Sequence, residues 1–219
     1  MGYKRGERLV GGIGVNDLAT PTRWTENGKS VKSPYYALWK DMLERVYTPN
    51  KNDIKPYAGV TVHADWHRFS NFKRWVDQQP QTDWQNLQLD KDLLVKGNKV
   101  YAPDVCCFLT NQENSLFKPS CVPFGSVRFD ERGNLRKPWQ VRNTFKGETN
   151  YKQFSTQQEA KVYGARVVIQ RVTDMANAHT HQFIRDAMFR WIADWRQELT
   201  VLEEAARVVQ SSAGSLFEN

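Results

Sequence analysis

The segment from residue 88 to residue 114 decides the prediction of the fold, and it reads QLDKDLLVKGNKVYAPDVCCFLTNQEN. Its apolar stretches indicate two short β-strands, and the polar stretch between them holds Asp90, Asp92 and Asn98. Asp92 lies two residues beyond Asp90, which places both carboxylates on the same face of a strand. Hard oxygen ligands of this kind suit Mg²⁺ or Mn²⁺. The segment therefore predicts either a divalent-metal site or an ordinary polar hairpin.

Two amphipathic segments precede this hairpin. In SPYYALWKDMLERVY, residues 33–47, Ser33 is a predicted N-cap and Pro34 occupies the first helical position. The apolar residues behind them recur at helical spacing, at Tyr35, Leu38, Trp39, Met42, Leu43 and Val46. Residues 57–66, YAGVTVHADW, predict a short strand, and residues 65–79, DWHRFSNFKRWVDQQ, predict a second helix. Residues 1–32 have no sustained periodicity and predict an extended N-terminal arm.

A second unit follows the hairpin. Three strand-like stretches, SVRFD, WQVRN and NYKQF, are separated by the turns ERGN and FKGE and predict an antiparallel meander. Thr156 and Glu159 form a predicted capping box, Thr-x-x-Glu, which starts a helix packed on the meander. The predicted fold class is therefore α+β, with a three-stranded antiparallel sheet on a helix in the second unit.

The C-terminal part of the chain predicts a long helix from about residue 177 to residue 210. It has a heptad-like apolar stripe made of Ile184, Met188, Trp191, Trp195, Leu199 and Leu202. Such a stripe is typical of a helix that packs on its own protein, and it is also compatible with self-association or a protein partner. Both interpretations stay open at this point.

Composition favours an anionic partner. The chain has 31 Lys and Arg against 24 Asp and Glu, a net charge of +7 and a pI of about 9.3, which favours nucleic acid through counterion release. No apolar run approaches the ~20 residues of a membrane span, and the N-terminus lacks a long apolar signal core. Three cysteines without paired C-x-x-C spacing favour a reducing compartment, and no zinc is expected.

Four blocks in order resemble the phage HNH-type homing endonucleases: YYALWKDMLERVY, YAGVTVHADWHRFSNFKRW, LDKDLLVKGNKVYAPDVCCF and NQENSLF. The resemblance covers roughly residues 11–117 and implies an HNH-like nuclease domain over residues 33–117, built around a ββα-metal hairpin with flanking helices. It also implies nicking or cleavage of double-stranded DNA with Mg²⁺ or Mn²⁺, in the cytoplasm of an infected bacterial cell.

The resemblance assigns roles to the polar hairpin. Asp90 matches the first-strand aspartate of the family and Asn98 the hairpin asparagine, so Asp90, Asp92 and Asn98 are the expected metal ligands. Lys91 stands where active members carry the histidine that deprotonates water, and a lysine with an ordinary pKa near 10.4 is a poor base at neutral pH. His63 is an alternative source of the imidazole. Two hypotheses follow: a metal-dependent DNA endonuclease, or a catalytically degenerate protein that binds DNA or a host protein.

The second unit resembles the Apetala-type DNA-binding domain appended to many phage HNH proteins, through GSVRFDERGNLRKPWQVRN and YKQFSTQQEAKVY. This resemblance implies a DNA-binding domain over residues 122–175, with residues 176–219 as a helical extension. It places Arg128, Trp139 and Arg142 on a sheet that lies in the DNA major groove. Further DNA-binding cations expected on or beside the meander are Arg132, Arg136, Lys137, Lys146 and Lys152.

Overall fold

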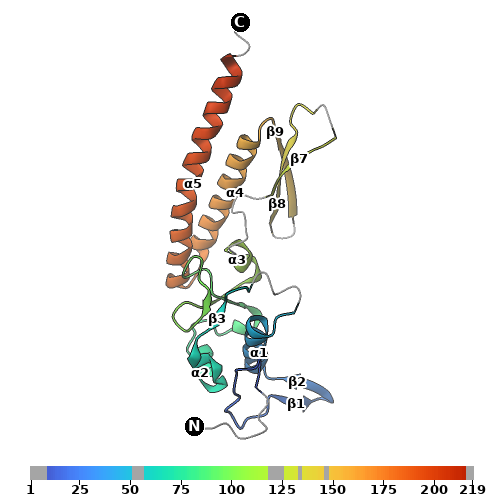
Figure 1. The fold of residues 1–219 in the computed structure, drawn as a ribbon, viewed down its shortest axis with the longest axis vertical. Helices are drawn as coiled ribbons and strands as arrows, with labels where there is room; N and C mark the ends of the chain where they lie inside the picture. The colour runs from blue at the N-terminus through green and yellow to red at the C-terminus, as the bar shows by residue number, and fades with distance from the viewer. Residues whose placement is uncertain (1–8, 51–56, 118–125, 133–134, 146–147, 216–219) are drawn as a thin grey trace. The chain divides into compact units, whose positions relative to one another are not determined.

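The computed structural model confirms a mixed α+β fold with a three-stranded antiparallel sheet and long C-terminal helices (Figure 1). It describes residues 9–50, 57–117, 126–132, 135–145 and 148–215. The chain divides into two compact units, Met1–Pro119 and Ser120–Asn219, called unit 1 and unit 2 below. This division falls between the segments that resemble the two domain types.

The first long helix, α1 (Pro34–Tyr47), begins where the sequence predicts. The Ser33 hydroxyl accepts a hydrogen bond from the Tyr36 amide at 3.4 Å, which satisfies one of the free N–H groups of the first turn. The stripe on its inner face buries Trp39 and Leu43 completely. The Trp39 indole N–H donates to the carbonyl of Trp66 at 2.6 Å, so this aromatic side chain satisfies its polar atom inside the core.

Aromatic side chains dominate the core of unit 1. The helix α2 (Phe69–Asp77) follows a short 3₁₀-helix, η1 (Ala64–His67), and supplies Phe72 and Trp75. The Trp66 ring meets Phe72 edge-on at 5.1 Å, and Trp75 packs 5.6 Å from Phe108. Many of the aromatic residues of the sequence therefore pack in the core of unit 1.

The segment from residue 88 to residue 114 contains three short strands of unit 1. The strand β4 (Gln88–Asp90) pairs antiparallel with β6 (Cys107–Leu109), and these are the two strands that the sequence predicts. Between them, β5 (Val100–Tyr101) pairs in parallel with β3 (Thr61–Val62). The remaining elements of this region are η2 (Trp84–Asn86) and α3 (Asn111–Leu116), which a Thr110–Glu113 capping box starts. The segment is thus a long excursion between paired strands, not a tight hairpin.

The prediction of an extended arm over residues 1–32 is wrong for much of this stretch. Val10 is buried in the core of unit 1, and Val15 bridges to Arg68. A side chain at Gly14 would collide with those of Leu43 and Trp39, so the chain approaches α1 closely there only because residue 14 is glycine. The strands β1 (Arg23–Glu26) and β2 (Lys29–Lys32) form an antiparallel hairpin.

The sheet of unit 2 has the strand order β7-β8-β9, with β7 (Ser126–Phe129), β8 (Trp139–Phe145) and β9 (Glu148–Phe154) all antiparallel. The helix α4 (Gln157–Ala178) contacts all three strands. It begins with the predicted Thr156–Glu159 capping box. Val141 at the centre of the sheet is fully buried, as are Ala160 and Ala165 on the helix, so small residues let the two layers approach closely.

The C-terminal helix begins later than the sequence predicts. The helical conformation is interrupted after α4. The next helix, α5 (Gln182–Ser215), packs against α4 (Figure 1). Ile184, Met188 and Trp195 are buried, so this part of the stripe serves the protein's own packing. Partner binding or self-association stays a prediction for the later part of α5. In the part of the chain that the structure describes, no helix is long and apolar enough to cross a membrane.

Candidate functional site: an acidic loop and an open sheet face

The acidic loop, residues 90–98, begins at the end of β4. Asp90 lies opposite Cys107 of β6 and is 3% exposed. Its Oδ1 accepts hydrogen bonds from the backbone N–H groups of Asp92 at 3.0 Å and Leu93 at 2.7 Å. This is the bonding of an aspartate that holds a turn, because one oxygen satisfies two buried backbone donors.

Burial raises the pKa of Asp90 to about 6, and the nearby negative charge of Asp92 adds to this shift. The two backbone N–H donors act in the opposite direction, since they stabilise the carboxylate, but they do not offset the loss of hydration. The Asp90 carboxyl therefore changes charge near neutral pH, within the range in which a hydrolytic acid or base works.

Lys91 lies inside this loop and pairs with Asp92. Its Nζ lies 2.7 Å from Asp92 Oδ1, and both side chains are largely buried. The same ammonium group donates to the carbonyl of Asn98 at 3.2 Å. The lysine that replaces the expected histidine thus neutralises one of the expected metal ligands.

Asn98 uses all of its amide atoms on the backbone. Its Nδ2 donates to the carbonyls of Lys91 at 2.8 Å and Val100 at 2.7 Å, and its Oδ1 accepts from the Val100 N–H at 3.0 Å. These three bonds tie the two arms of the loop together next to Gly97, whose φ of +75° suits a glycine. Asn98 is therefore a brace of the loop.

The loop does not fit a divalent cation well. Asp90 Oδ1 holds two backbone donors, Asp92 Oδ1 holds the Lys91 ammonium, and Asn98 Oδ1 holds a backbone donor. Among the described residues, no group of three or more His, Cys, Asp or Glu side chains lies together. A bound cation would have to displace the lysine charge. The structure brings the expected ligands together, but as a braced, internally paired loop.

His63 has local partners. Its Nδ1 accepts from the Asp65 N–H at 3.3 Å and lies 3.6 Å from the Asp65 carboxylate, at the N-cap of η1. About half of the side chain is exposed. The His63 imidazole therefore caps the start of η1, and none of these contacts involves a residue of the acidic loop.

The sheet of unit 2 separates its side chains by alternation. Directly paired residues share a face, and neighbours along a strand point to opposite faces. Arg128 pairs with Gln140, which pairs with Gln153, and Arg142 pairs with Tyr151. Buried Val141 marks the face that packs on α4. The other face, called the open face, carries Arg128, Gln140, Arg142, Thr144, Thr149, Tyr151 and Gln153.

Trp139 does not belong to the open face, which corrects the expectation from the sequence. It pairs with Phe129 and Phe154 and shares the parity of Val141, so it lies on the helix-facing side. Its ring packs edge-on against Phe129 at 5.1 Å, and Phe154 packs 5.1 Å from Tyr163 of α4. Because Trp139 and Arg142 differ by three positions, one strand cannot present both on the same face.

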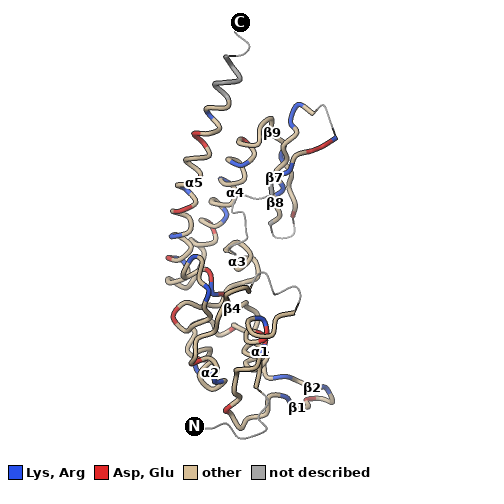
Figure 2. The backbone as a smooth tube through the Cα atoms, viewed as in Figure 1, with Lys and Arg blue, Asp and Glu red and all other residues tan. Residues whose placement is uncertain are grey.

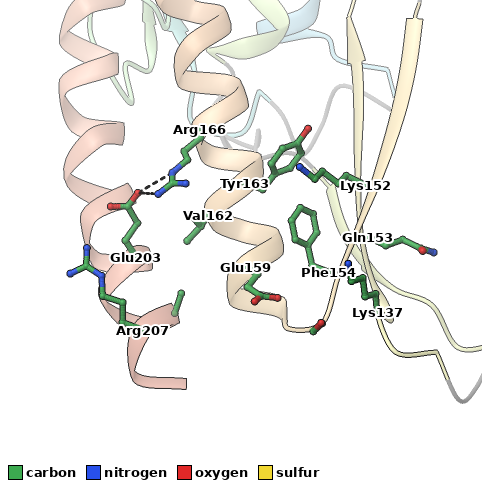
Figure 3. Close-up of a pocket in the computed structure, with 12 residues that line it drawn as sticks. Lys137, Lys152, Gln153, Phe154, Glu159, Val162, Tyr163, Arg166, Glu203 and Arg207 are labelled. Atoms are coloured by element: carbon green, nitrogen blue, oxygen red, sulfur yellow. Dashed lines mark hydrogen bonds and ion pairs between the residues drawn. The ribbon is translucent and has the colours of Figure 1, made fainter. Parts of the chain in front are cut away.

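Lys152 is placed differently as well. It pairs with Val141, on the helix-facing side, and its Nζ lies 4.4 Å above the Tyr163 ring. Figure 3 shows it in a groove between β9, α4 and α5, which Lys137 also lines. Arg166 of α4 and Glu203 of α5 form an ion pair at 2.7 Å in the same groove. Lys152 therefore makes a cation–π contact on the helix-facing side of the sheet.

Two of the remaining expected cations, Arg132 and Arg136, lie between β7 and β8. Arg132 is exposed and grips Asp130 with two hydrogen bonds, at 2.9 and 2.6 Å, and this contact lowers the pKa of Asp130. Arg136 is exposed in the segment that leads into β8. Lys146 lies outside the described residues.

Five members of the open face were not predicted from the sequence: Gln140, Thr144, Thr149, Tyr151 and Gln153. Tyr151 is 59% exposed although it is aromatic, and Gln153 is also exposed. The alternation of strand side chains could have identified them. Every second residue along a strand from Arg128 or Arg142, together with its directly paired residue on the next strand, lies on the same face.

In comparisons with known proteins, no family model matches this chain, and no curated protein or solved structure matches it.

We predict that the charge of Asp90 makes stability depend on pH. The folded protein keeps this proton up to about pH 6, whereas the unfolded chain loses it near 3.8. The stabilisation that the protonated Asp90 gives to the folded protein is therefore fully present below pH 3.8. It falls by about 3 kcal/mol in unfolding free energy as the pH rises to about 6. Urea unfolding measured from about pH 4 to pH 7 should show this decline in the parent relative to Asp90→Asn, which keeps the Oδ1 acceptor. Parallel curves for the two proteins would contradict it.

A second prediction compares two ion pairs of equal length. Lys91–Asp92 and Lys73–Asp77 both have an N···O distance of 2.7 Å, but only the first is buried. Lys91→Met leaves a buried carboxylate unpaired, so we expect a loss of about 3–5 kcal/mol in unfolding free energy. Lys73→Met, the matched control on the surface of α2, should cost less than about 1 kcal/mol. Chemical denaturation of both variants measures the difference, and equal losses would refute the role of burial.

Proposed function

We propose that this protein binds double-stranded DNA through the open face of the β7–β8–β9 sheet. The observation that carries this proposal is the sorting of side chains by face. Arginine, glutamine and threonine lie on the open face, whereas the apolar partners of α4 lie on the other. A sheet that packs on a helix through one face has the second face free for a ligand.

The chemistry of the open face suits base edges. Arg128 and Arg142 present forked donors that match the O6 and N7 acceptors of guanine, and Gln140 and Gln153 can bond the N6 and N7 of adenine. Thr144 and Thr149 share a hydrogen bond at 2.9 Å and can contact bases or phosphates. β-sheet proteins are known to read DNA with strands placed in a groove. The net charge of +7 supports the same class of partner.

The braced acidic loop leads us to favour a non-catalytic role for unit 1. A hydrolytic site needs oxygens that are open to a cation and a base that takes a proton from water. Asp92 is instead neutralised by Lys91, and the amide of Asn98 holds the backbone. We therefore propose that the HNH-like segment stabilises unit 1 and that its loop does not hydrolyse DNA.

Metal-dependent cleavage of DNA is the second candidate, and one observation favours it. Asp90 and Asp92 are neighbouring buried carboxylates, and the pKa of Asp90 is raised to about 6 by burial. Such a perturbed carboxylate pair is a feature of many catalytic sites. This candidate requires that Lys91 releases Asp92 when DNA binds.

The DNA-binding proposal predicts that base readers and packing residues respond differently. Arg142→Ala should cost ~1–3 kcal/mol on a preferred duplex and flatten the preference between sequences, since a forked contact to a base is lost. Trp139→Phe is the control from the same strand, and it should lower the melting temperature while it leaves binding unchanged. Gel-shift titrations at two salt concentrations measure both variants. An Arg128→Ala/Arg142→Ala double variant that binds as the parent does would exclude the open face.

The two candidate roles of unit 1 predict different results in a nicking assay. We expect supercoiled plasmid incubated with the full chain and Mg²⁺ or Mn²⁺ to stay as intact as it does with Asp92→Asn, which keeps an oxygen acceptor for Lys91. Agarose gels that resolve nicked from supercoiled plasmid provide the measurement. Nicking by the parent that Asp92→Asn abolishes would refute the structural role and establish the nuclease.

A further inference from the structure

The β1–β2 hairpin is well defined although almost nothing covers it. Seven of its eight strand residues are exposed, and Trp24 is 42% exposed. Its turn is Asn27–Gly28, with φ values of +50° and +73°, the left-handed pair that gives a tight two-residue connection. Isolated two-stranded hairpins are marginal in water, so this one depends on its turn and on its attachment to unit 1.

The attachment is short. The Ser33 N–H donates to the carbonyl of Thr22 at 2.9 Å and closes the base of the hairpin. Ser33 is also the N-cap of α1, and β2 ends at the residue before it. Only Ser33 separates the end of β2 from the start of α1.

The register sorts the hairpin side chains into two faces. Arg23 pairs with Lys32 and Thr25 with Ser30, so one face carries two cations and two hydroxyl groups. The other face carries Trp24 with Val31, and Glu26 with Lys29. The only carboxylate of the ribbon therefore lies away from the Arg23–Lys32 face. Figure 2 shows the basic residues of the two strands on this projecting ribbon.

We infer that the Arg23–Lys32 face is a second DNA-contacting surface, which enters the major groove as a two-stranded ribbon. The inference rests on the proposed function only in taking DNA as the partner. The major groove admits a two-stranded β-ribbon, arginine and lysine pair with guanine edges or phosphates, and serine and threonine bond either. Three cations stand against one carboxylate between residues 23 and 32, which is the charge complement of a phosphate backbone.

A protein partner is a poorer match for the same surface. Protein interfaces enrich aromatic and apolar anchors at their centre, whereas lysine is depleted there. The aromatic residue of the ribbon, Trp24, lies on the face opposite the two paired cations, next to Val31. The Arg23–Lys32 face offers only cations and hydroxyl groups, which are the groups that contact phosphates and base edges.

The test uses the full chain and a duplex that it selects from a randomised library. Arg23→Ala/Lys32→Ala should weaken binding by roughly 5- to 150-fold and lower the slope of log K against log salt by ~2. In a hydroxyl-radical footprint, this variant should lose one protected segment of the duplex and keep the segment protected by the open face. The Arg128→Ala/Arg142→Ala variant should lose the other segment.

Lys40→Ala/Lys73→Ala is the matched control, because it removes the same charge from α1 and α2, where each lysine is paired with a carboxylate. It should leave both protected segments and nearly the whole salt slope. A ribbon variant that keeps both segments and the parent's slope overturns this inference, whatever the sheet variant does. Loss of a segment in the ribbon variant alone supports the ribbon and overturns the sheet. A parent chain that selects no duplex overturns both.

Discussion

The two-residue alternation of β8, fixed where Val141 packs against α4, determines what unit 2 can present to a ligand. Val141 is fully buried and faces α4, which makes its pairing partners Val127 and Lys152 share that side. Every residue displaced by one position then faces outward. A shift of the register by one residue would bury Arg142 and expose Val141, so the apolar contact with the helix and the polar open face are consequences of the same constraint.

A comparable constraint acts on the acidic loop. Buried polar atoms need partners, and in this loop the partners come from within the chain. Asp90 satisfies two backbone donors, Asn98 satisfies three backbone groups with one side chain, and Lys91 compensates the charge of Asp92. Residue types that can ligate a cation thus make hydrogen bonds and an ion pair within this loop. The ammonium group of Lys91 brings a positive charge to the Asp92 carboxylate within the loop itself.

Local patterns predicted the elements well and their placement less well. The cap at Ser33, the capping box at Thr156 and the meander follow from rules that act over a few residues, and all three are present. The partner of β5 and the burial of Val10 depend on contacts between distant segments, which periodicity does not encode. The resemblance groups Trp139 with Arg128 and Arg142. The alternation of the strand already separates Trp139 from Arg142, because residues three positions apart lie on opposite faces.

The distribution of paired charges gives the basic composition a structural meaning. Three cations on the helices are matched by carboxylates: Lys40 pairs with Glu44, Lys73 with Asp77 and Arg166 with Glu203. The β1–β2 hairpin and the β7–β8–β9 sheet differ from the helices. Among the described residues, no carboxylate lies within ion-pair distance of Arg23, Lys32, Arg128 or Arg142. A cation paired with a carboxylate contributes little field at a distance, whereas an unpaired cation attracts phosphate. These four cations stand on exposed strands, whose side chains are perpendicular to a surface that fits a groove.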